Sequence, residues 1–114
     1  LTDYALQRMT KIIRNLTVFP EMMEKNIHLT NNAIFSSRVL TALIEKGMTR
    51  ENAYDLIQPS SMDSALNHTD FKKNIESNAE VRKHLTLDEI QSCFTYDPYL
   101  KNVDYIYTKV GILS

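Results

Sequence analysis

The chain has 114 residues, which is enough for one domain that buries its own core without disulfides or metals. Its residues are 43% hydrophobic and 24% charged, so we expect a folded protein. Thirteen basic and fourteen acidic side chains give a formal charge of -1, which argues against a nucleic-acid-binding protein. No apolar run approaches the roughly 20 residues of a membrane span and no signal peptide opens the chain. These two absences and the presence of a single cysteine, Cys93, favour a reducing, cytoplasmic location.

The scarcity of turn-forming residues predicts an all-α fold. The sequence has two glycines and three prolines, and it lacks the Asn-Gly and Asp-Gly pairs of tight β-hairpins. Residues 1–19 begin in helical phase and carry an apolar stripe, with a second apolar flank at Leu6 and Ile13. We therefore expect the end of a longer helix, in a fragment of a larger protein. The stripe comprises Leu1, Ala5, Met9, Ile12, Leu16 and Phe19.

A second, long helix is expected over residues 20–46. Pro20 suits the first turn of a helix and disfavours helical geometry in the residue before it, so the first helix should end near Phe19. The polar middle of the second helix, HLTNN, indicates a bend or a surface that faces a cleft. The positions expected to be buried are Met23, Ile27, Ile34, Leu40, Leu43 and Ile44.

Gly47 and Thr49 predict a helix end followed by a new helix start. Glycine adopts the left-handed conformation at little steric cost, and Thr49 with Asn52 forms a weak variant of the capping box. Pro59 lies inside the next apolar pattern, and we expect the helix to kink there and to continue to about Leu66.

Shorter helices are expected in the remainder of the chain. They cover residues 70–76 and 79–85, a helix opened by the capping box of Thr86 and Glu89, and a last helix opened by Asp97 and Pro98 and ended by Gly111. Residues 20–114 are thus predicted to form a small domain of about five to six helices.

Little in the sequence indicates a reactive site. The three histidines, His28, His68 and His84, share no face and have no partner at metal-ligand spacing, so no metal site is expected. Cys93 is interpreted as a small buried hydrophobe, since no positioned base accompanies it. The tyrosines at 96, 99, 105 and 107 are expected to pack between helices, because no basic groove accompanies them to bind a nucleic acid.

The polar cluster Ser36, Ser37 and Arg38 is the one candidate for a ligand contact. Its groups lie in a helix expected to be buried, where an unpaired polar group costs about 1–3 kcal/mol. The guanidinium of Arg38 suits a carboxylate or a phosphate. We favour an ion pair within the domain or a contact with another subunit, and keep Ser36 and Arg38 as candidates for substrate binding.

Three blocks of the chain resemble the C-terminal region of adenylosuccinate lyases, in the same order and at the same spacing. They are YALQRMTKIIRNLTVFPEMMEKNI, IFSSRVLTALIEKGMTRENAYDLIQPSSM and LTLDEIQSCFTYDPYLKNVDYIYTKVGI. The resemblance implies a homotetrameric lyase of the fumarase/aspartase superfamily, without metal or organic cofactor. Such enzymes release fumarate from adenylosuccinate, giving AMP, and cleave the succinyl-carboxamide ribotide of purine biosynthesis.

The resemblance also implies that this segment carries no catalytic residue. The family's catalytic serine lies on an S-S-x-M-P-x-K-x-N loop, and QPSSMDSAL lacks that continuation, so Ser60 and Ser61 are not the catalytic pair. Residues 1–19 would end a helix of the central domain, which forms the tetramer core, and residues 20–114 would be the third domain. Two positions depart from the family pattern, namely Asn32 for a glycine and Ser37 for a glutamine.

Two alternatives remain at this stage. Another superfamily lyase, such as argininosuccinate lyase, shares part of the pattern but not the closing CF…VD block. A stand-alone helical interaction module would instead bind a partner helix through the exposed face of residues 1–19.

Overall fold

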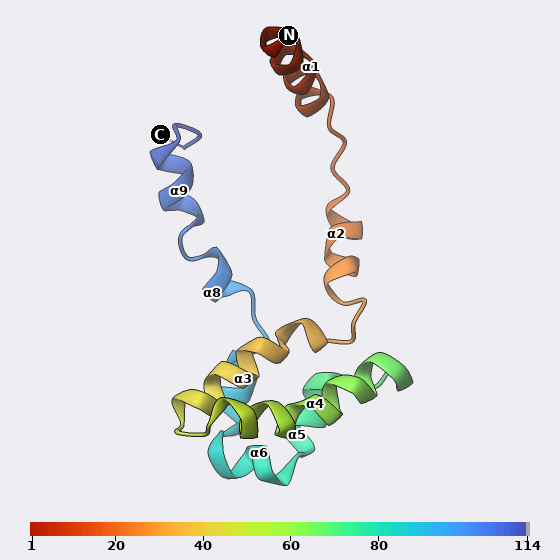
Figure 1. Cartoon of the computed structure of the whole chain (residues 1–114), viewed down its shortest axis with the longest axis vertical. Coiled ribbons are helices and arrows are strands. Elements are labelled where there is room, and N and C mark those ends of the chain that lie inside the picture. Colours follow the sequence, from red (N-terminus) through yellow and green to blue (C-terminus); the bar gives the residue numbers. More distant parts are fainter. Residues whose placement is uncertain (114) are drawn as a thin grey trace.

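The computed structural model describes residues 1–113, and the elements in this part of the chain are helices joined by loops (Figure 1). The all-α prediction is confirmed. In chain order the elements are α1 (Thr2–Arg14), α2 (Pro20–Ile27), the short 3₁₀ helix η1 (Ala33–Phe35), α3 (Ser36–Glu45), α4 (Arg50–Asn67), α5 (Phe71–Ser77), α6 (Ala79–His84), α7 (Leu87–Ser92), α8 (Asp97–Leu100) and α9 (Val103–Lys109).

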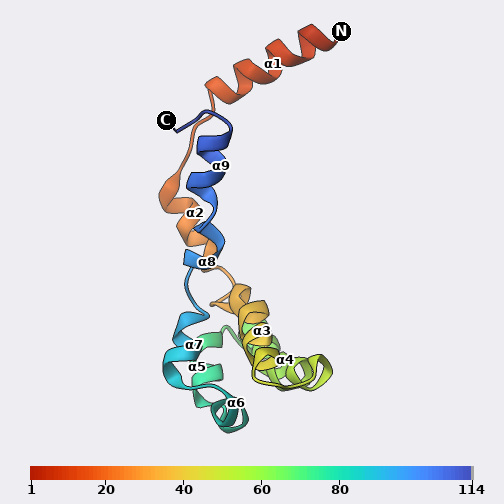
Figure 2. The same cartoon turned by 90° about the vertical axis from the view of Figure 1, so that its left-hand side faces the viewer.

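The molecule consists of a helical body and two arms. The helical body is residues 33–94, from η1 to α7, in which α3 packs on α4, α4 on α5, and α5 on α6 and α7. The N-terminal arm is residues 1–32 with α1 and α2, and the C-terminal arm is residues 95–113 with α8 and α9. Both arms project from the same end of the body, so the two termini lie far from its core (Figures 1 and 2).

Among residues 1–113, every buried hydrophobic residue lies in the helical body. Phe71 and Ile75 from α5 meet Val39 and Leu43 from α3, and all four are fully buried. The aromatic ring of Phe71 lies 5.9 Å from that of Phe94. The remaining buried hydrophobic residues are Phe35, Ala53, Ile57, Val81, Leu85, Ile90 and Cys93.

Local signals placed several helix ends correctly. Gly47 has φ +95, in the left-handed region, and its N–H donates to the Ile44 carbonyl. The Thr49 side chain accepts from the N–H of Asn52, at 3.3 Å, and α4 continues through Pro59 to Asn67. At α7, Thr86 and Glu89 form the full capping box that the sequence predicts.

The predicted long helix over residues 20–46 is wrong in its middle. α2 ends at Ile27, and Asn31 and Asn32 adopt positive φ values of 49 and 69 before η1 and α3 begin. Contacts distant in sequence hold this break: the Phe71 N–H donates to the Asn31 carbonyl at 3.0 Å, and the Asn32 amide donates to Asp70 at 3.1 Å. The start of α5 therefore docks on the break and replaces the helical hydrogen bonds lost there.

Three further expectations need correction. α1 ends at Arg14 and not near Phe19, and the Asn15 side chain donates to the Lys11 carbonyl at that end. The predicted last helix is divided into α8 and α9, and the predicted second helix is divided by the break after α2. Residues 20–113 therefore contain eight α-helices, more than the five to six expected. Met23 and Ile34, expected to be buried, are 59% and 53% exposed, because Met23 lies in the N-terminal arm and Ile34 lies on η1 beside an open crevice at the bases of the arms.

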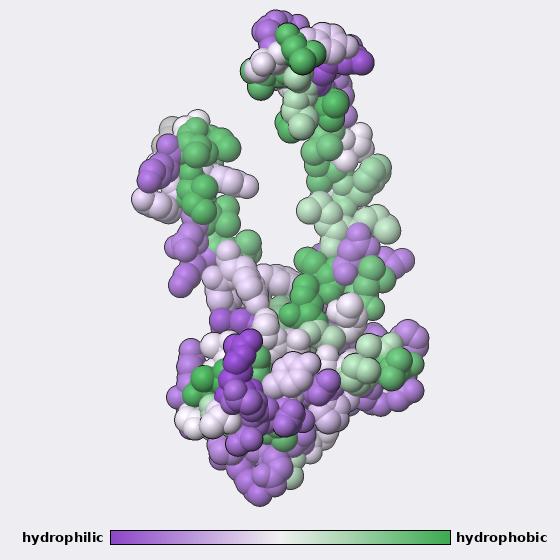
Figure 3. Space-filling view, viewed as in Figure 1, coloured by the Kyte–Doolittle hydropathy of each residue, from purple (hydrophilic) through white to green (hydrophobic). Residues whose placement is uncertain are grey.

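No residue of either arm is buried in the part of the chain that the structure describes. α1, α2, α8 and α9 contain no buried side chain, although the apolar stripe predicted for residues 1–19 is present. The tyrosines at 99, 105 and 107 are also exposed, Tyr105 by 66%, so among residues 1–113 their predicted packing between helices does not occur, whereas Tyr96 lies beside Phe35 with ring centroids 6.0 Å apart. The space-filling view shows the two arms standing apart, with apolar side chains along both (Figure 3).

Candidate functional site

The structure places Ser36 and Arg38 on different sides of α3. Ser36 lines a shallow pocket toward α4, together with Tyr54 and Gln58. Arg38 lines a second pocket, of about 200 Å³, toward α7. The polar cluster that the sequence suggested is therefore divided between two pockets.

The Arg38 pocket joins α3 to the segment that carries α7. α3 and the residue that follows it contribute positive and negative side chains, Arg38, Glu45 and Lys46, and the facing segment contributes Glu89 and Cys93. The Nε of Arg38 is buried without a hydrogen-bond partner among residues 1–113. The expected ion pair of Arg38 with a carboxylate of the domain is not present among residues 1–113. The complete lining is Arg38, Thr41, Ala42, Glu45, Lys46, Leu85, Glu89, Ser92 and Cys93.

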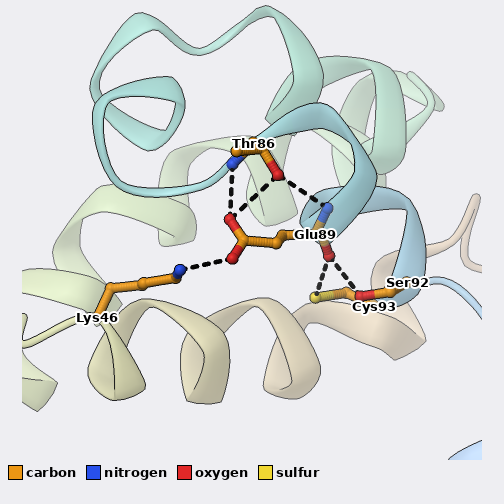
Figure 4. A network of polar contacts seen from close by, with 5 residues as sticks. All are labelled: Lys46, Thr86, Glu89, Ser92 and Cys93. Carbon is orange, nitrogen blue, oxygen red and sulfur yellow. Dashed lines mark hydrogen bonds and ion pairs between the residues drawn. The ribbon is translucent and has the colours of Figure 1, made fainter.

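Glu89 is the centre of the polar contacts in this pocket (Figure 4). Its Oε1 pairs with Lys46 Nζ at 2.5 Å, and its Oε2 accepts the Thr86 N–H at 2.9 Å. The Glu89 N–H donates back to Thr86 Oγ1 at 3.2 Å, which completes the capping box. One side chain thus both begins α7 and ties it to the end of α3.

The environment of Glu89 favours the ionised carboxylate. The Lys46 hydrogen bond, followed by that of the Thr86 backbone, lowers the pKa of Glu89 to about 2. A carboxyl group with such a pKa stays ionised at neutral pH and is a poor general acid or base there. The contacts of Glu89 indicate a structural role.

Cys93 is buried, as the sequence predicted, with 3% of its surface exposed. Its Sγ donates to the Glu89 carbonyl at 3.3 Å, and the Ser92 hydroxyl donates to the same carbonyl at 2.7 Å. Burial raises the pKa of the Cys93 thiol, although the charge of Arg38 acts in the opposite direction. The thiol is therefore protonated and unsuited to nucleophilic attack at neutral pH.

The histidines do not meet. His28 contacts the Tyr96 hydroxyl through Nε2 at 3.1 Å, and this contact links the bases of the two arms. His68 ends α4 with a positive φ of 56, and His84 is exposed in the last turn of α6. Within residues 1–113 no group of three or more His, Cys, Asp or Glu side chains is arranged to hold a metal ion. The same residues include no helix that is long and apolar enough to cross a membrane.

Sequence comparison places this geometry in an enzyme family. Residues 32–110 match the family described as adenylosuccinate lyase C-terminus. The chain belongs to the adenylosuccinate lyase family. This assignment covers α3 to α9 and hence the whole helical body, with its Arg38 pocket and Glu89 contacts.

Two curated relatives extend the similarity to almost the whole chain. The chain is 46% identical to the adenylosuccinate lyase of Streptococcus mutans serotype c over 112 residues, or 98% of this chain. It is 42% identical to the adenylosuccinate lyase of Bacillus subtilis over 110 residues, or 96% of this chain. In both cases the matched stretch spans 26% of the relative, so the chain corresponds to about a quarter of a lyase of this family.

Sequence reasoning missed the pairing of Lys46 with Glu89. The capping box identified Glu89 as the third residue of α7, but nothing local indicates that the end of α3 lies beside it. The two residues are far apart in sequence and meet only because α3 and α7 share the core formed by Leu43 and Ile90. A local pattern could not have found this ion pair.

Proposed function

We propose that this chain is the C-terminal part of an adenylosuccinate lyase. The whole enzyme would release fumarate from adenylosuccinate, giving AMP, and from the succinyl-carboxamide ribotide in purine biosynthesis. The observation that carries the proposal is 46% identity to a curated adenylosuccinate lyase over 98% of the chain. The proposal includes a cytoplasmic enzyme that needs no metal or organic cofactor.

In this proposal the segment itself does no chemistry. The Arg38 pocket contains a carboxylate with a pKa of about 2 and a buried thiol with a raised pKa, neither of which suits proton transfer or nucleophilic attack at neutral pH. The helical body would instead brace the rest of the enzyme. Residues 1–19 would end a helix of the central domain, through which the homotetramer forms, and the exposed apolar stripe of α1 supports this role.

Arg38 remains the stronger of the two candidates for a contact beyond this chain, because its Nε is buried and unpaired among residues 1–113. If Arg38 binds the substrate in the assembled enzyme, Arg38→Lys raises KM and leaves unfolding and assembly unchanged. If Arg38 binds another subunit, the same change weakens the tetramer in sedimentation. Ser36→Ala is the matched change on the other side of α3. Because Ser36 lines a different pocket, we expect this change neither to raise KM nor to weaken the tetramer.

The proposal is tested by expressing the complete gene that encodes this chain and measuring fumarate release. We expect turnover of adenylosuccinate, no turnover of argininosuccinate, and no activity from the 114-residue chain alone. Turnover of argininosuccinate in place of adenylosuccinate would overturn the substrate assignment. A complete gene product that lacks any lyase activity would favour an interaction module.

A further inference from the structure

The bases of the two arms enclose an apolar crevice of about 440 Å³. We call this the basal crevice. Phe35 from η1 and Tyr96 from the C-terminal arm form part of its wall, with ring centroids 6.0 Å apart. The His28–Tyr96 contact joins the two arms at the same level, at 3.1 Å. The complete lining is Ile27, Ile34, Phe35, Tyr96, Tyr99 and Leu100.

Apolar side chains continue from the basal crevice along both arms. On the C-terminal arm, Leu100 and Ile106 are 57% and 51% exposed, and on the N-terminal arm Met22 and Met23 are 51% and 59% exposed. In the space-filling view the apolar residues of the C-terminal arm gather on the side that faces the other arm (Figure 3). A contiguous apolar surface of this kind marks a site of interaction.

The overall dimensions of the chain indicate that another segment fills the space between the two arms. The radius of gyration is 19.4 Å, whereas a compact domain of this length has a radius of about 13 Å. The difference arises because α1 and α9, the outer helices of the two arms, extend away from the helical body (Figures 1 and 2). The matched stretch spans only 26% of either relative, and the family match is to the lyase C-terminus. Most of such a polypeptide therefore precedes this stretch in the relatives.

We propose that an apolar helix from the preceding part of the same lyase polypeptide lies between the two arms and inserts its side chains into the basal crevice. A helix suits the site because its apolar residues at positions i, i+3, i+4 and i+7 can fill a groove along its length. The crevice lining has no charged side chain, and its only polar side-chain groups are the hydroxyls of Tyr96 and Tyr99, of which that of Tyr96 already contacts His28. The site therefore selects apolar anchors over charged ones. This inference rests on the proposed function, because it requires the longer polypeptide.

Cysteine labelling tests this inference directly. Leu100→Cys places a thiol in the basal crevice, and Leu66→Cys places a control thiol on α4, at a leucine that is 70% exposed. The native Cys93 is buried and serves as an unreactive internal reference. Each variant is prepared in the complete gene product and in the 114-residue chain, and maleimide uptake at each cysteine is followed by peptide mass spectrometry.

We expect Leu100→Cys to react about tenfold more slowly in the complete protein than in the 114-residue chain, because the occupant must leave before the thiol is accessible. Leu66→Cys should react equally in both. Equal reactivity of Leu100→Cys in the two proteins, or equal protection of both thiols in the complete protein, would overturn the proposal. Protection of Leu100→Cys in a 114-residue chain that sediments as a dimer would show a second copy in the crevice and overturn it as well. Ile106→Cys repeats the test higher on the arm.

Fumarate release from the same complete protein separates this inference from the proposed function. An active lyase that labels freely at Leu100→Cys overturns the inference alone. A protein that is protected at Leu100→Cys but shows no lyase activity overturns the proposed function and leaves the docked helix standing.

Discussion

The helical body and the arms are built from helices of the same kind but differ in what happens to their apolar side chains. In the body, Val39 and Leu43 of α3 are fully buried against neighbouring helices. In the N-terminal arm, Met9 and Ile12 of α1 occupy equivalent positions of an amphipathic stripe and are 58% and 62% exposed. An apolar stripe indicates that a helix needs a partner, but it does not indicate whether the partner lies in the same stretch of chain.

The comparison also separates two kinds of stability. Packing in the body removes apolar surface from water, which is the main favourable term in folding, whereas no residue of the arms, 1–32 and 95–113, is fully buried. Short helices without tertiary packing are marginal in water. The body should therefore control the cooperative unfolding of the 114-residue chain, and changes in the arms should affect it little.

The largest expected effect distinguishes two phenylalanines. Phe71→Ala removes a fully buried ring and should lower the free energy of unfolding by about 3–5 kcal/mol, or unfold the chain outright. Phe19→Ala, at a ring that is 63% exposed, should change it by less than about 0.5 kcal/mol. Urea unfolding followed by circular dichroism measures both. Similar losses for the two variants would contradict the division into body and arms.

A smaller effect is expected at the two glycines. Gly47 and Gly111 both have positive φ values, +95 and +76, and an added Cβ meets no atom within 4 Å at either position. Gly47→Ala should destabilise the body by about 1–2 kcal/mol through backbone strain alone. Gly111→Ala carries similar strain at the end of α9, yet it should leave urea unfolding of the body unchanged, because α9 buries nothing. Equal losses would show that the C-terminal arm unfolds together with the body.

The capping box of α7 should contribute less to the free energy of unfolding than Gly47 does. Thr86→Ala removes the acceptor for the Glu89 N–H and should cost about 1 kcal/mol. Thr108→Ala, in the last turn of α9, is the matched change in an arm. Thermal unfolding of the two variants checks the difference, and an unchanged midpoint for Thr86→Ala would mean that α7 forms without its cap.

The smallest effect is expected in the pH dependence of stability. The pKa of Glu89 is about 2 in the folded chain, below its ordinary value of 4.5, so the folded state favours the ionised form. The stabilisation is present above pH 4.5 and is lost as the pH falls toward 2. Acid titration of the unfolding midpoint measures it. Lys46→Met removes the main cause of the lowered pKa and should flatten the curve in this range, and an unaltered curve would assign the acid sensitivity to other groups.

Local chemistry accounts for the parts of the fold that the sequence predicted well. Gly47 ends α3, Thr49 begins α4, and Thr86 with Glu89 begins α7. Each of these signals depends on backbone groups within a few residues, so tertiary packing is not needed to express it. The resemblance to adenylosuccinate lyases was equally available, because it rests on residue identities and their spacing.

The features that the sequence did not predict have a different physical cause. The polar stretch HLTNN indicated a bend between α2 and α3, but not the hydrogen bonds that Asn31 and Asn32 share with the start of α5. The ion pair of Lys46 with Glu89 and the separation of Ser36 from Arg38 likewise depend on how α3 lies between α4 and α7. These features involve residues that are distant in sequence.

The sequence by itself determined the helical class, most helix ends, the cap of α7 and membership of the lyase family, because these depend on local backbone energetics and on residue identity. The tertiary structure alone decided which apolar stripes are buried, where the second helix breaks and which charges meet. Burial and ion pairing depend on distances between segments, and those distances are set only when the helices pack. The arms show this most directly, since the apolar stripe of α1 includes Met9 and Ile12 and remains exposed.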